Sequence, residues 1–316
     1  MLTRTVLAVI GILAFVVFSF ALAGFLSVDN LINLLNEVAL AGIVAMPATF
    51  LIMSGQVDLS VGGAAAFAGI VLAATAPGLG LPTAVLLAAG SSLLIGIGNG
   101  LLVTSGRVDS IAATFATMAL LRGLAYLVPG GLAIELAGYR SLGDTRPFPG
   151  IALPTLIFGA VTLIAGVLSQ SAVGRRTRDT GQLPAVDRFD GQRERHWVIT
   201  LFVVSGVSAA LVGLIMASQL GAGLPTAAIG LELTVVTAVL LGGGRLAGGP
   251  GSVAGTLLAL LVISIIGNGL SLANVNPYIG PVLSAGLLIL ALVIDRPRRR
   301  PPTQLAVSAR TDNTGQ

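Results

Sequence analysis

The chain of 316 residues contains no cysteine and no lysine, and its only histidine is His196. Without cysteine there can be no disulfide, thiolate nucleophile or cysteine-ligated metal site. Without lysine there is no phosphate-binding loop of the Gly-x-x-x-x-Gly-Lys-Ser/Thr type, because that loop needs a lysine at the phosphates. A lone histidine in a charged segment supports neither a metal cluster nor a Ser-His-Asp triad. We therefore expect no metal or cofactor, and any ATPase that drives this protein must be another polypeptide.

Charged residues are also scarce, at 9% of the chain, whereas 55% of the residues are hydrophobic. A soluble core cannot use that much apolar surface, so the composition predicts a polytopic membrane protein. All 17 basic residues are arginine, and the net charge is +4. These arginines cluster at the flanks of apolar runs, as the positive-inside rule expects, which argues against a nucleic-acid partner.

Ten apolar runs approach the length of about 20 residues that a transmembrane helix needs. The sequence therefore predicts an all-α membrane protein of about ten spans. Their expected ranges are 5–27, 34–54, 58–76, 81–105, 108–129, 150–170, 197–217, 228–242, 252–270 and 277–294. Ten spans place Arg4, the arginine-rich loop 171–196 and the basic tail 295–316 on one side, which the positive-inside rule makes the cytoplasm.

The two ends of the chain carry separate expectations. Residues 1–294 form the expected transmembrane domain, and the polar tail 295–316 is expected to be a disordered cytoplasmic segment. Residues 1–23 could instead be a cleaved signal peptide, since Ala21-Leu-Ala23 is a suitable cleavage sequence. The apolar run is longer than the usual length of about 7–15 residues, which favours a retained first span.

A short internal repeat suggests how the spans are related. Gly-Asn-Gly-Leu occurs at 98–101 in the fourth span and again at 267–270 in the ninth. These positions are equivalent if the protein consists of two five-helix halves of opposite topology. Four residues can recur by chance in a chain with 42 glycines, so the repeat is only a hint of a 5+5 inverted repeat.

The segment 51–63 interrupts two apolar runs with glycines and three polar residues, Gln56, Asp58 and Ser60. A carboxylate at the centre of a membrane helix costs about 2.5–3.5 kcal/mol on insertion scales. Such a group is tolerated where it faces protein or a water-filled path, and it then marks function. The alternative is a short loop at the membrane surface in which Asp58 caps the next helix. The spacing alone leaves both interpretations open.

Other polar residues interrupt the later spans. Arg122 could face a hydrophilic path, or it could bind a helix end without meeting any solute. Glu232 could likewise be an interfacial carboxylate, and an asparagine in a span normally joins helices by hydrogen bonds. The residues that we assign as candidates for a translocation path are Gln56, Asp58, Ser60, Asn99, Arg122, Glu232 and Asn268.

The central loop 171–196 contains an apolar pair, Val186 and Phe189, that would share one face of a short helix. A short charged helix with an apolar knob suits docking into a groove of a partner protein. A solvated connector is the alternative. A second glycine-rich stretch, 241–256, is interpreted as a turn that lets helices pack closely through small residues.

Four ordered segments resemble the permeases of bacterial ABC importers for ribose-like sugars and autoinducer-2. Ser54-Gly-Gln-Val-Asp-Leu-Ser-Val-Gly62, preceded by Ile43-Val-Ala-Met-Pro47, is similar to the "G-G-I-D-L-S-V-G" signature of that family. The other segments are Asn99-Gly100 with 108–123, the run from Pro225-Thr-Ala through Gly230-Leu-Glu-Leu233 to Gly255-Thr256, and Asn268-Gly-Leu270. The "D-L-S-V-G" form favours the sugar branch of this family over its branched-chain amino acid branch.

The resemblance implies a type II importer permease with ten helices that performs no bond chemistry. Its implied partners are two cytoplasmic ATPase subunits or domains, an extracytoplasmic solute-binding protein, and a second permease copy or sister permease. The implied location is the bacterial inner membrane, with both termini cytoplasmic. The implied ATPase-coupling residues are Gly181, Gln182, Pro184, Val186, Asp187, Arg188, Phe189 and Gly191.

One departure from the family pattern affects coupling. The family usually has an apolar run after Gly174-Arg175, but here the charged segment 176–180 follows, and acids stand at Asp187 and Asp190. Three alternatives stay open at this point: an ion-coupled secondary transporter, in which Asp58, Arg122 and Glu232 would form the coupling site; a structural or orphan membrane subunit that lost coupling through the altered central loop; and a branched-chain amino acid ABC permease. The solute itself (pentose, hexose, deoxyhexose or autoinducer-2) is open as well.

Overall fold

The computed structural model describes residues 2–136, 138–139, 141–148, 151–184, 188–276 and 279–294, and most of them are helical. The expected coupling residues Val186 and Asp187 and the tail 295–316 lie outside the described residues. The helices are α1 (Leu2–Ala21), α2 (Val28–Met53), α3 (Val61–Leu79), α4 (Leu81–Thr104), α5 (Ser110–Leu127), α6 (Ser141–Asp144), α7 (Leu153–Gln170), α8 (Ala172–Gln182), α9 (Gln192–Leu220), α10 (Leu231–Leu241), α11 (Val253–Leu272) and α12 (Ile279–Ile294). Two short strands, β1 (Ile134–Glu135) and β2 (Ala222–Gly223), pair antiparallel.

Each of the ten expected spans overlaps one helix, in order α1, α2, α3, α4, α5, α7, α9, α10, α11 and α12. Seven of the described helices are long and apolar enough to cross a membrane: α2, α3, α4, α5, α7, α9 and α11. The apolar parts of α1 and α10 are shorter. The prediction of a helical, polytopic membrane protein is therefore confirmed.

Local sequence explains where several helices begin and end. Asp109 precedes α5, and its Oδ1 accepts hydrogen bonds from the backbone amides of Ile111 and Ala112. This N-cap satisfies amides that have no partner within the helix. At the other end of a span, α9 stops at Gly221, which adopts the left-handed conformation with φ 63° that glycine tolerates best.

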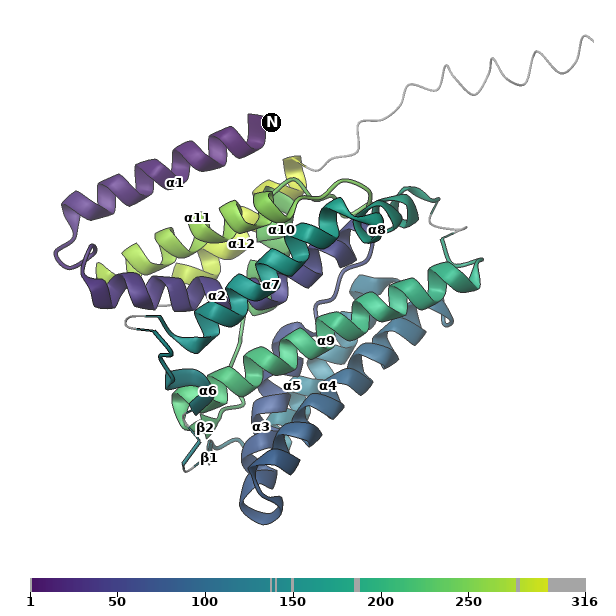
Figure 1. Ribbon diagram of the computed structural model, residues 1–316, viewed down its shortest axis with the longest axis horizontal. Helices are drawn as coiled ribbons and strands as arrows, with labels where there is room; N and C mark the ends of the chain where they lie inside the picture. Colours follow the sequence, from purple (N-terminus) through teal and green to yellow (C-terminus); the bar gives the residue numbers. More distant parts are fainter. Residues whose placement is uncertain are drawn as a thin grey trace, which may run out of the picture.

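The helices gather in two groups (Figure 1). Each group includes one helix from the other half of the sequence: α9 packs with α3 and α4, and α2 packs with α10 and α11. In the first group α4 runs along α9, and α3 packs against α4, α5 and α9. In the second group α11 packs along α2, and α10 packs against α2, α11 and α12. The helices α2 and α9 also touch each other, while α1 lies against α11 and α7 against α2. The long helices α2 and α9 thus join the two groups.

Small residues allow close contact between α4 and α9. At Gly206 of α9 an added Cβ would overlap the Ser92 carbonyl oxygen of α4, and at Gly96 of α4 it would lie 2.6 Å from the Phe202 carbonyl oxygen of α9. These backbones therefore approach as glycine-containing membrane helices do, through dispersion contacts rather than hydrophobic burial.

One end of the helix bundle, which we call the α8 face, contains α8, residues 183–184 and 188–191, and the turn 242–252 between α10 and α11. The C-terminal end of α2 lies there too, because the Gly249 amide donates to the Met53 carbonyl at 2.8 Å. The loop between α4 and α5 reaches the same face through Arg107. The N-terminal end of α2 and the C-terminal end of α11 lie at the opposite face.

Candidate functional site

The break between α2 and α3 places the Asp58 carboxylate inside the first helix group. Asp58 is 6% exposed, and both of its oxygens accept hydrogen bonds. Oδ1 accepts from the Ser60 amide at 2.9 Å and from the Ser60 hydroxyl at 2.5 Å, and Oδ2 accepts from the Ser205 hydroxyl of α9 at 2.7 Å. A donor set on both oxygens is the arrangement that stabilises a buried carboxylate.

The hydrogen bonds continue from Asp58 into two further helices. Asn99 of α4 donates from Nδ2 to the Ser60 hydroxyl at 2.9 Å. Its Oδ1 accepts from the Thr117 hydroxyl of α5 at 2.7 Å. A chain of polar groups therefore runs from α5 through α4 and the break to α9. Because each group has a partner, this network fixes the relative positions of the elements of the first group.

The backbone of the same break is satisfied by α5. The Val57 amide donates to the Ser110 hydroxyl at 3.1 Å, and the Leu59 amide donates to the Thr114 hydroxyl at 2.9 Å. Gln56, which is also buried, donates its backbone amide to the Leu51 carbonyl at 3.1 Å. Irregular backbone at membrane depth is tolerated where protein supplies such partners.

A second irregular segment, 224–230, precedes α10 and depends on Arg122 of α5. One guanidinium nitrogen, Nη1, donates to the carbonyls of Pro225 at 2.9 Å and Ala227 at 2.7 Å. Arg122 thus supplies the hydrogen bonds that the broken backbone lacks. Both breaks are therefore held by side chains of the same helix, α5.

The two breaks meet where α3 and α10 begin. At Gly62 of α3 an added Cβ would overlap Oε2 of Glu232 and lie 2.8 Å from the Ala228 carbonyl oxygen. Glu232 stands in the first turn of α10, is 9% exposed, and its Oε2 has no hydrogen-bond partner among the described residues. Asp58 stands just before α3 in the same way. A carboxylate near a helix N-terminus compensates the positive end of the helix dipole. The helices that follow the two breaks, α3 and α10, therefore each have an acid at their N-terminus.

A hollow of about 510 Å³ opens between α2, α9, α10 and α11 and includes Glu37 and Glu232 in its wall. A neighbouring hollow of about 380 Å³ at the face opposite α8 shares Glu37 with it. Its polar wall residues are Asn30, Asn33, Asn36, Glu37, Asn268 and Ser271. Amides and carboxylates of this kind offer many donors and acceptors, so the smaller hollow suits a polar solute rich in hydroxyl groups, whereas the larger hollow is lined mainly by apolar residues around Glu37 and Glu232.

Asn268 has a fixed orientation within that wall. Its amide and the amide of Asn30 form two reciprocal hydrogen bonds of 2.9 and 3.0 Å, which join α2 to α11. Asn36 accepts a hydrogen bond from Gln219 of α9 at 3.0 Å. Of the candidate path residues, Glu232 and Asn268 therefore line hollows, whereas Gln56, Asp58, Ser60 and Asn99 are enclosed in the first helix group.

On the α8 face, α8 itself presents small residues to the protein and arginines to the outside. Its buried residues are Gly174, Thr177, Thr180 and Gly181. At Gly181 an added Cβ would overlap the Met53 carbonyl oxygen and lie 2.6 Å from the Gly249 amide nitrogen. The end of α8 is therefore packed directly against the end of α2 and the turn before α11. The sequence predicted a short helix around Val186 and Phe189. Val186 lies outside the described residues, α8 ends at Gln182, and Phe189 lies in a turn.

Arg188 points inward and connects four segments of this face. It is 7% exposed, and its guanidinium donates to carbonyls of the break, α8, the following segment and the turn before α11. The acceptors and distances are Gly55 at 3.1 Å, Gly181 at 3.1 Å, Leu183 at 3.2 Å and Ala247 at 3.2 Å. Burial lowers the pKa of the Arg188 guanidinium, which nevertheless keeps its charge in a protein.

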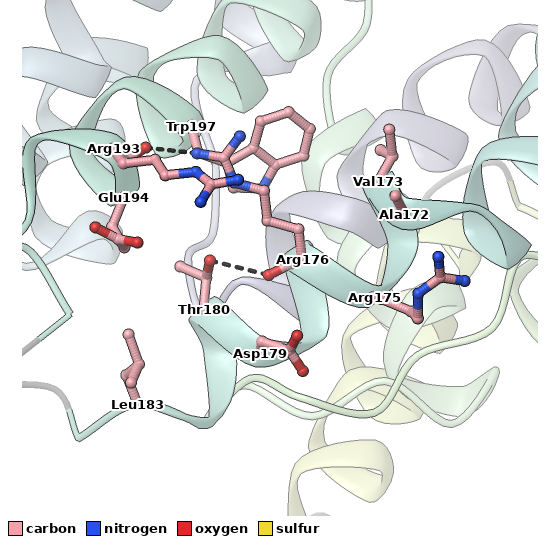
Figure 2. A pocket seen from close by; sticks show the side chains of 10 residues that line it. All are labelled: Ala172, Val173, Arg175, Arg176, Asp179, Thr180, Leu183, Arg193, Glu194 and Trp197. Atoms are coloured by element: carbon pink, nitrogen blue, oxygen red, sulfur yellow. Dashed lines mark hydrogen bonds between the residues drawn. The ribbon is translucent and has the colours of Figure 1, made fainter.

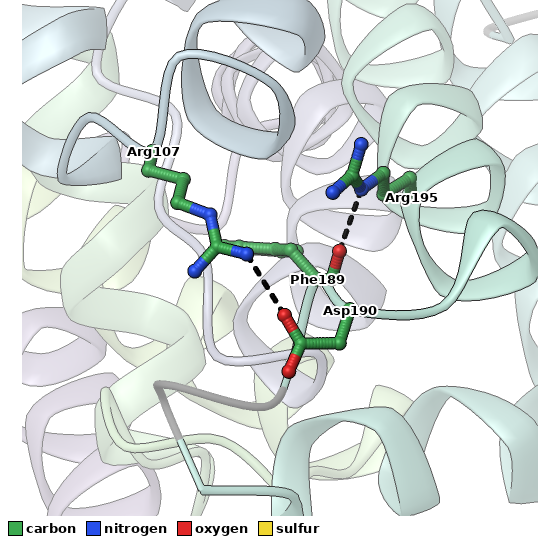
Figure 3. Close-up of polar contacts among 4 residues, drawn as sticks. All are labelled: Arg107, Phe189, Asp190 and Arg195. Atoms are coloured by element: carbon green, nitrogen blue, oxygen red, sulfur yellow. Dashed lines mark hydrogen bonds and ion pairs between the residues drawn. The ribbon is translucent and has the colours of Figure 1, made fainter.

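The other expected coupling residues lie nearer to solvent. Gln182 and Pro184 are exposed, and Gly191 is the N-cap of α9. Asp190 pairs with Arg107 at 2.8 Å, and the Phe189 carbonyl accepts a hydrogen bond from Arg195 Nε at 2.6 Å; both contacts are drawn in Figure 3. Phe189 itself is half-buried against the core. This arrangement leaves Gln182 and Pro184 as the described coupling residues that a partner could reach most directly.

Sequence reasoning missed several residues of these sites. Ser205 donates to Asp58, Thr117 donates to Asn99, and Asn30 pairs with Asn268. Asn36 lines the hollow of about 380 Å³. The run Asn30, Asn33, Asn36 and Glu37 follows helical spacing at the start of α2 and could have been found as a polar face. A single serine in α9 carries no such signal.

The sequence model of the family described as "Branched-chain amino acid transport system / permease component" matches residues 30–292. The ribose import permease protein RbsC of Escherichia coli strain K12 is 33% identical over 286 residues, which cover 87% of this chain and 88% of the relative. RbsC of Haemophilus influenzae is 34% identical over 303 residues, 92% of each chain. The L-arabinose ABC transporter permease protein AraH of Azospirillum brasilense is 29% identical over 312 residues, 95% of this chain and 89% of the relative. No solved structure matches the chain.

Proposed function

The chain belongs to the branched-chain amino acid transport system permease family, and from that premise we propose that it is the membrane permease subunit of an ATP-driven monosaccharide importer. The observation that carries the proposal is the match to relatives named for ribose and arabinose transport over most of both chains. The solute is a monosaccharide or a similar small polyol, a class that includes autoinducer-2. The subunit is a permease rather than an enzyme, and separate subunits hydrolyse ATP.

The alternative transport mechanisms are less well supported. An ion-coupled transporter would need titratable groups free to exchange ions. Of the three residues expected at such a site, Arg122 is bound to backbone carbonyls and Asp58 to three donors, and only Glu232 has an unpartnered oxygen. A branched-chain amino acid permease fits the family description, but the similar curated relatives are named for sugars.

We further propose ten crossings with both termini and the α8 face in the cytoplasm. The short α10 covers only about 16 Å, so its crossing includes the irregular segment 224–230, which lines the hollow at 228–230. The helix contacts support a 5+5 inverted repeat in which α2–α5 corresponds to α9–α12. In this repeat the contact between α4 and α9 corresponds to that between α11 and α2, and the contact between α3 and α5 corresponds to that between α10 and α12. Each half also has one break, which precedes α3 in the first half and α10 in the second. The packing of α1 on α11 supports a retained first span.

The two hollows of about 510 and 380 Å³ form the proposed extracytoplasmic part of the translocation path. Glu37, Glu232 and Asn268 line it, and the enclosed residues Asp58 and Asn99 hold the first helix group against which the second moves. Solute would arrive from an extracytoplasmic binding protein. Coupling to two ATPase subunits would use α8 and the segment 183–191, and a second permease copy or sister permease would complete the assembly.

The absence of cysteine allows a direct test of this path. Ser264 of α11 lines the hollow of about 510 Å³, so Ser264→Cys should react with a membrane-impermeant maleimide added from outside, and bound ribose or arabinose should slow that reaction severalfold. Ser218→Cys is the matched control, because Ser218 is fully buried in α9 and should stay unlabelled. Labelling of Ser264→Cys that a sugar never slows would contradict the assignment of this hollow.

The proposed function is tested by gentle purification of the tagged chain from its native membrane. An ABC ATPase should co-purify in a fixed ratio, and reconstituted vesicles should accumulate a monosaccharide only with that ATPase, ATP and a binding protein. Accumulation driven by an ion gradient without any ATPase would overturn the proposal in favour of secondary transport. Accumulation of branched-chain amino acids would overturn the assignment of the solute.

A further inference from the structure

We propose that the crevice formed by α7, α8 and α9 binds one anionic phospholipid, with its phosphate among arginines of the α8 face and an acyl chain between α7 and α9. The proposal needs only the membrane location of the chain, not the importer function. It rests on two adjoining hollows of opposite character.

The first hollow, of about 630 Å³, lies beside α8 and the start of α9 (Figure 2). Three arginines line it: Arg175, Arg176 and Arg193. The Arg176 guanidinium stacks over the Trp197 ring at 4.7 Å from the ring centroid and donates to the Arg193 carbonyl at 2.7 Å. Figure 2 shows the Arg176 and Arg193 side chains converging beside that ring. Paired guanidinium groups of this kind bind a phosphate through several charge-assisted hydrogen bonds.

Two acids, Asp179 and Glu194, line the same hollow as the three arginines, so its formal charge stays positive. The only ion pair found among the described residues joins Arg107 and Asp190, away from this hollow. Of the two acids, Glu194 turns its carboxylate back to Gly191, where an added Cβ would overlap its Oε2. The positive charge of Arg176 and Arg193 is therefore available to an external anion.

The second hollow, of about 330 Å³, is an apolar groove between α2, α7 and α9, and Val173 and Trp197 line both hollows. Its wall on α9 extends from Trp197 to Leu211, a rise of about 21 Å. One leaflet of the hydrocarbon core is about 15 Å thick, so the groove is long enough for an acyl chain. The α7 side is open, because two of its lining residues, Ile164 and Leu168, are 57% and 36% exposed.

The junction of the two hollows has the chemistry of a membrane interface. Trp197 has an apolar ring and a polar tip, and tryptophan is enriched where headgroups meet acyl chains. A basic pocket directly above a groove for one chain matches the shape and charge of a phospholipid with an anionic headgroup. An acidic segment of an ATPase would match the arginines but not the apolar groove at membrane depth. A second permease copy would match the groove but not the arginines.

The test counts lipids on the intact purified chain by native mass spectrometry, with phosphatidylglycerol, phosphatidylcholine and soluble glycerol phosphate as probes. We expect one phosphatidylglycerol to bind more tightly than phosphatidylcholine, and glycerol phosphate not to displace it. The double variant Arg176→Gln/Arg193→Gln should bind phosphatidylglycerol about 30-fold more weakly, at about fivefold for each arginine near a membrane surface. Arg178→Gln is the matched control, because Arg178 lies on α8 outside the pocket lining and should bind like the unmodified chain.

A groove variant separates the lipid from a free anion. Val204→Trp fills the groove and leaves every arginine in place, so it should weaken phosphatidylglycerol binding at least severalfold. Equal binding of the two lipids, or unchanged binding in both variants, would overturn the proposal. Displacement by glycerol phosphate would reduce the site to an anion site and likewise overturn it. Loss of a co-purified ATPase with lipid binding unchanged would assign the arginines to that partner instead.

Discussion

Asp58→Ala is expected to destabilise the protein more than any other exchange of a single acid. The alanine removes the acceptor of two hydroxyls and one amide, all buried. Hydrogen bonds to a charged group contribute about 1.5–3 kcal/mol each, and the groups left behind stay unpaired. Because the three bonds share one acceptor, we expect a loss of about 4 kcal/mol, or roughly 10 °C in the apparent melting temperature in detergent.

Asp109 provides the matched control for this experiment. It is an exposed aspartate that also accepts backbone hydrogen bonds, as the N-cap of α5. Removing such a cap costs about 1 kcal/mol, so Asp109→Ala should lower the melting temperature by only a few degrees. Equal losses in both variants would show that the Asp58 network contributes nothing beyond an ordinary cap.

A second exchange separates the charge of Asp58 from its shape. Asp58→Asn keeps a side chain of the same size: its carbonyl oxygen can still accept from the Ser60 amide and hydroxyl, and the Ser205 hydroxyl can rotate to accept from its NH2 group. We expect normal membrane insertion, an intermediate melting temperature and reduced uptake, measured with the ATPase and binding protein present. Full uptake by this variant would remove any functional role from the charge.

The sequence predicted the helices well because hydropathy and length act locally. Each expected span overlaps a helix, and the break at Gln56–Ser60 was visible as glycine and polar residues between apolar runs. The same pattern could not reveal what the break contacts. Ser205 lies 147 residues from Asp58, and nothing in its neighbourhood distinguishes it from other serines in α9.

The direction of a charged side chain was the other feature that sequence alone could not give. Arg122 and Arg188 carry the same guanidinium as the surface arginines of α8, but both turn inward to carbonyls of broken backbone. Composition places arginine at membrane flanks on average. Whether one arginine faces a partner or completes the backbone depends on unpaired carbonyls that only the assembled fold brings within reach.

Arg188→Met is expected to uncouple ATP hydrolysis from uptake. Methionine is long and unbranched like arginine, but it leaves four carbonyl acceptors from four segments without this donor. Because the guanidinium is the shared contact of α8, the break before α3 and the turn before α11, its loss frees α8 to move without moving the helices. We expect uptake per ATP hydrolysed to fall at least about tenfold, a change equivalent to about 1.4 kcal/mol.

Arg107→Met tests whether any arginine of the α8 face would have the same effect. Arg107 also binds the segment 183–191, through Asp190, but the two side chains are 56% and 59% exposed. Exposed ion pairs contribute about 0–1 kcal/mol, so transport should stay close to normal in this variant. Arg188→Lys should restore only part of the coupling, because a point charge cannot reproduce the planar fork that reaches separated carbonyls. Equal coupling in the two methionine variants would contradict a connecting role for Arg188, and retention of the ATPase by both would show that the defect lies in transmission rather than docking.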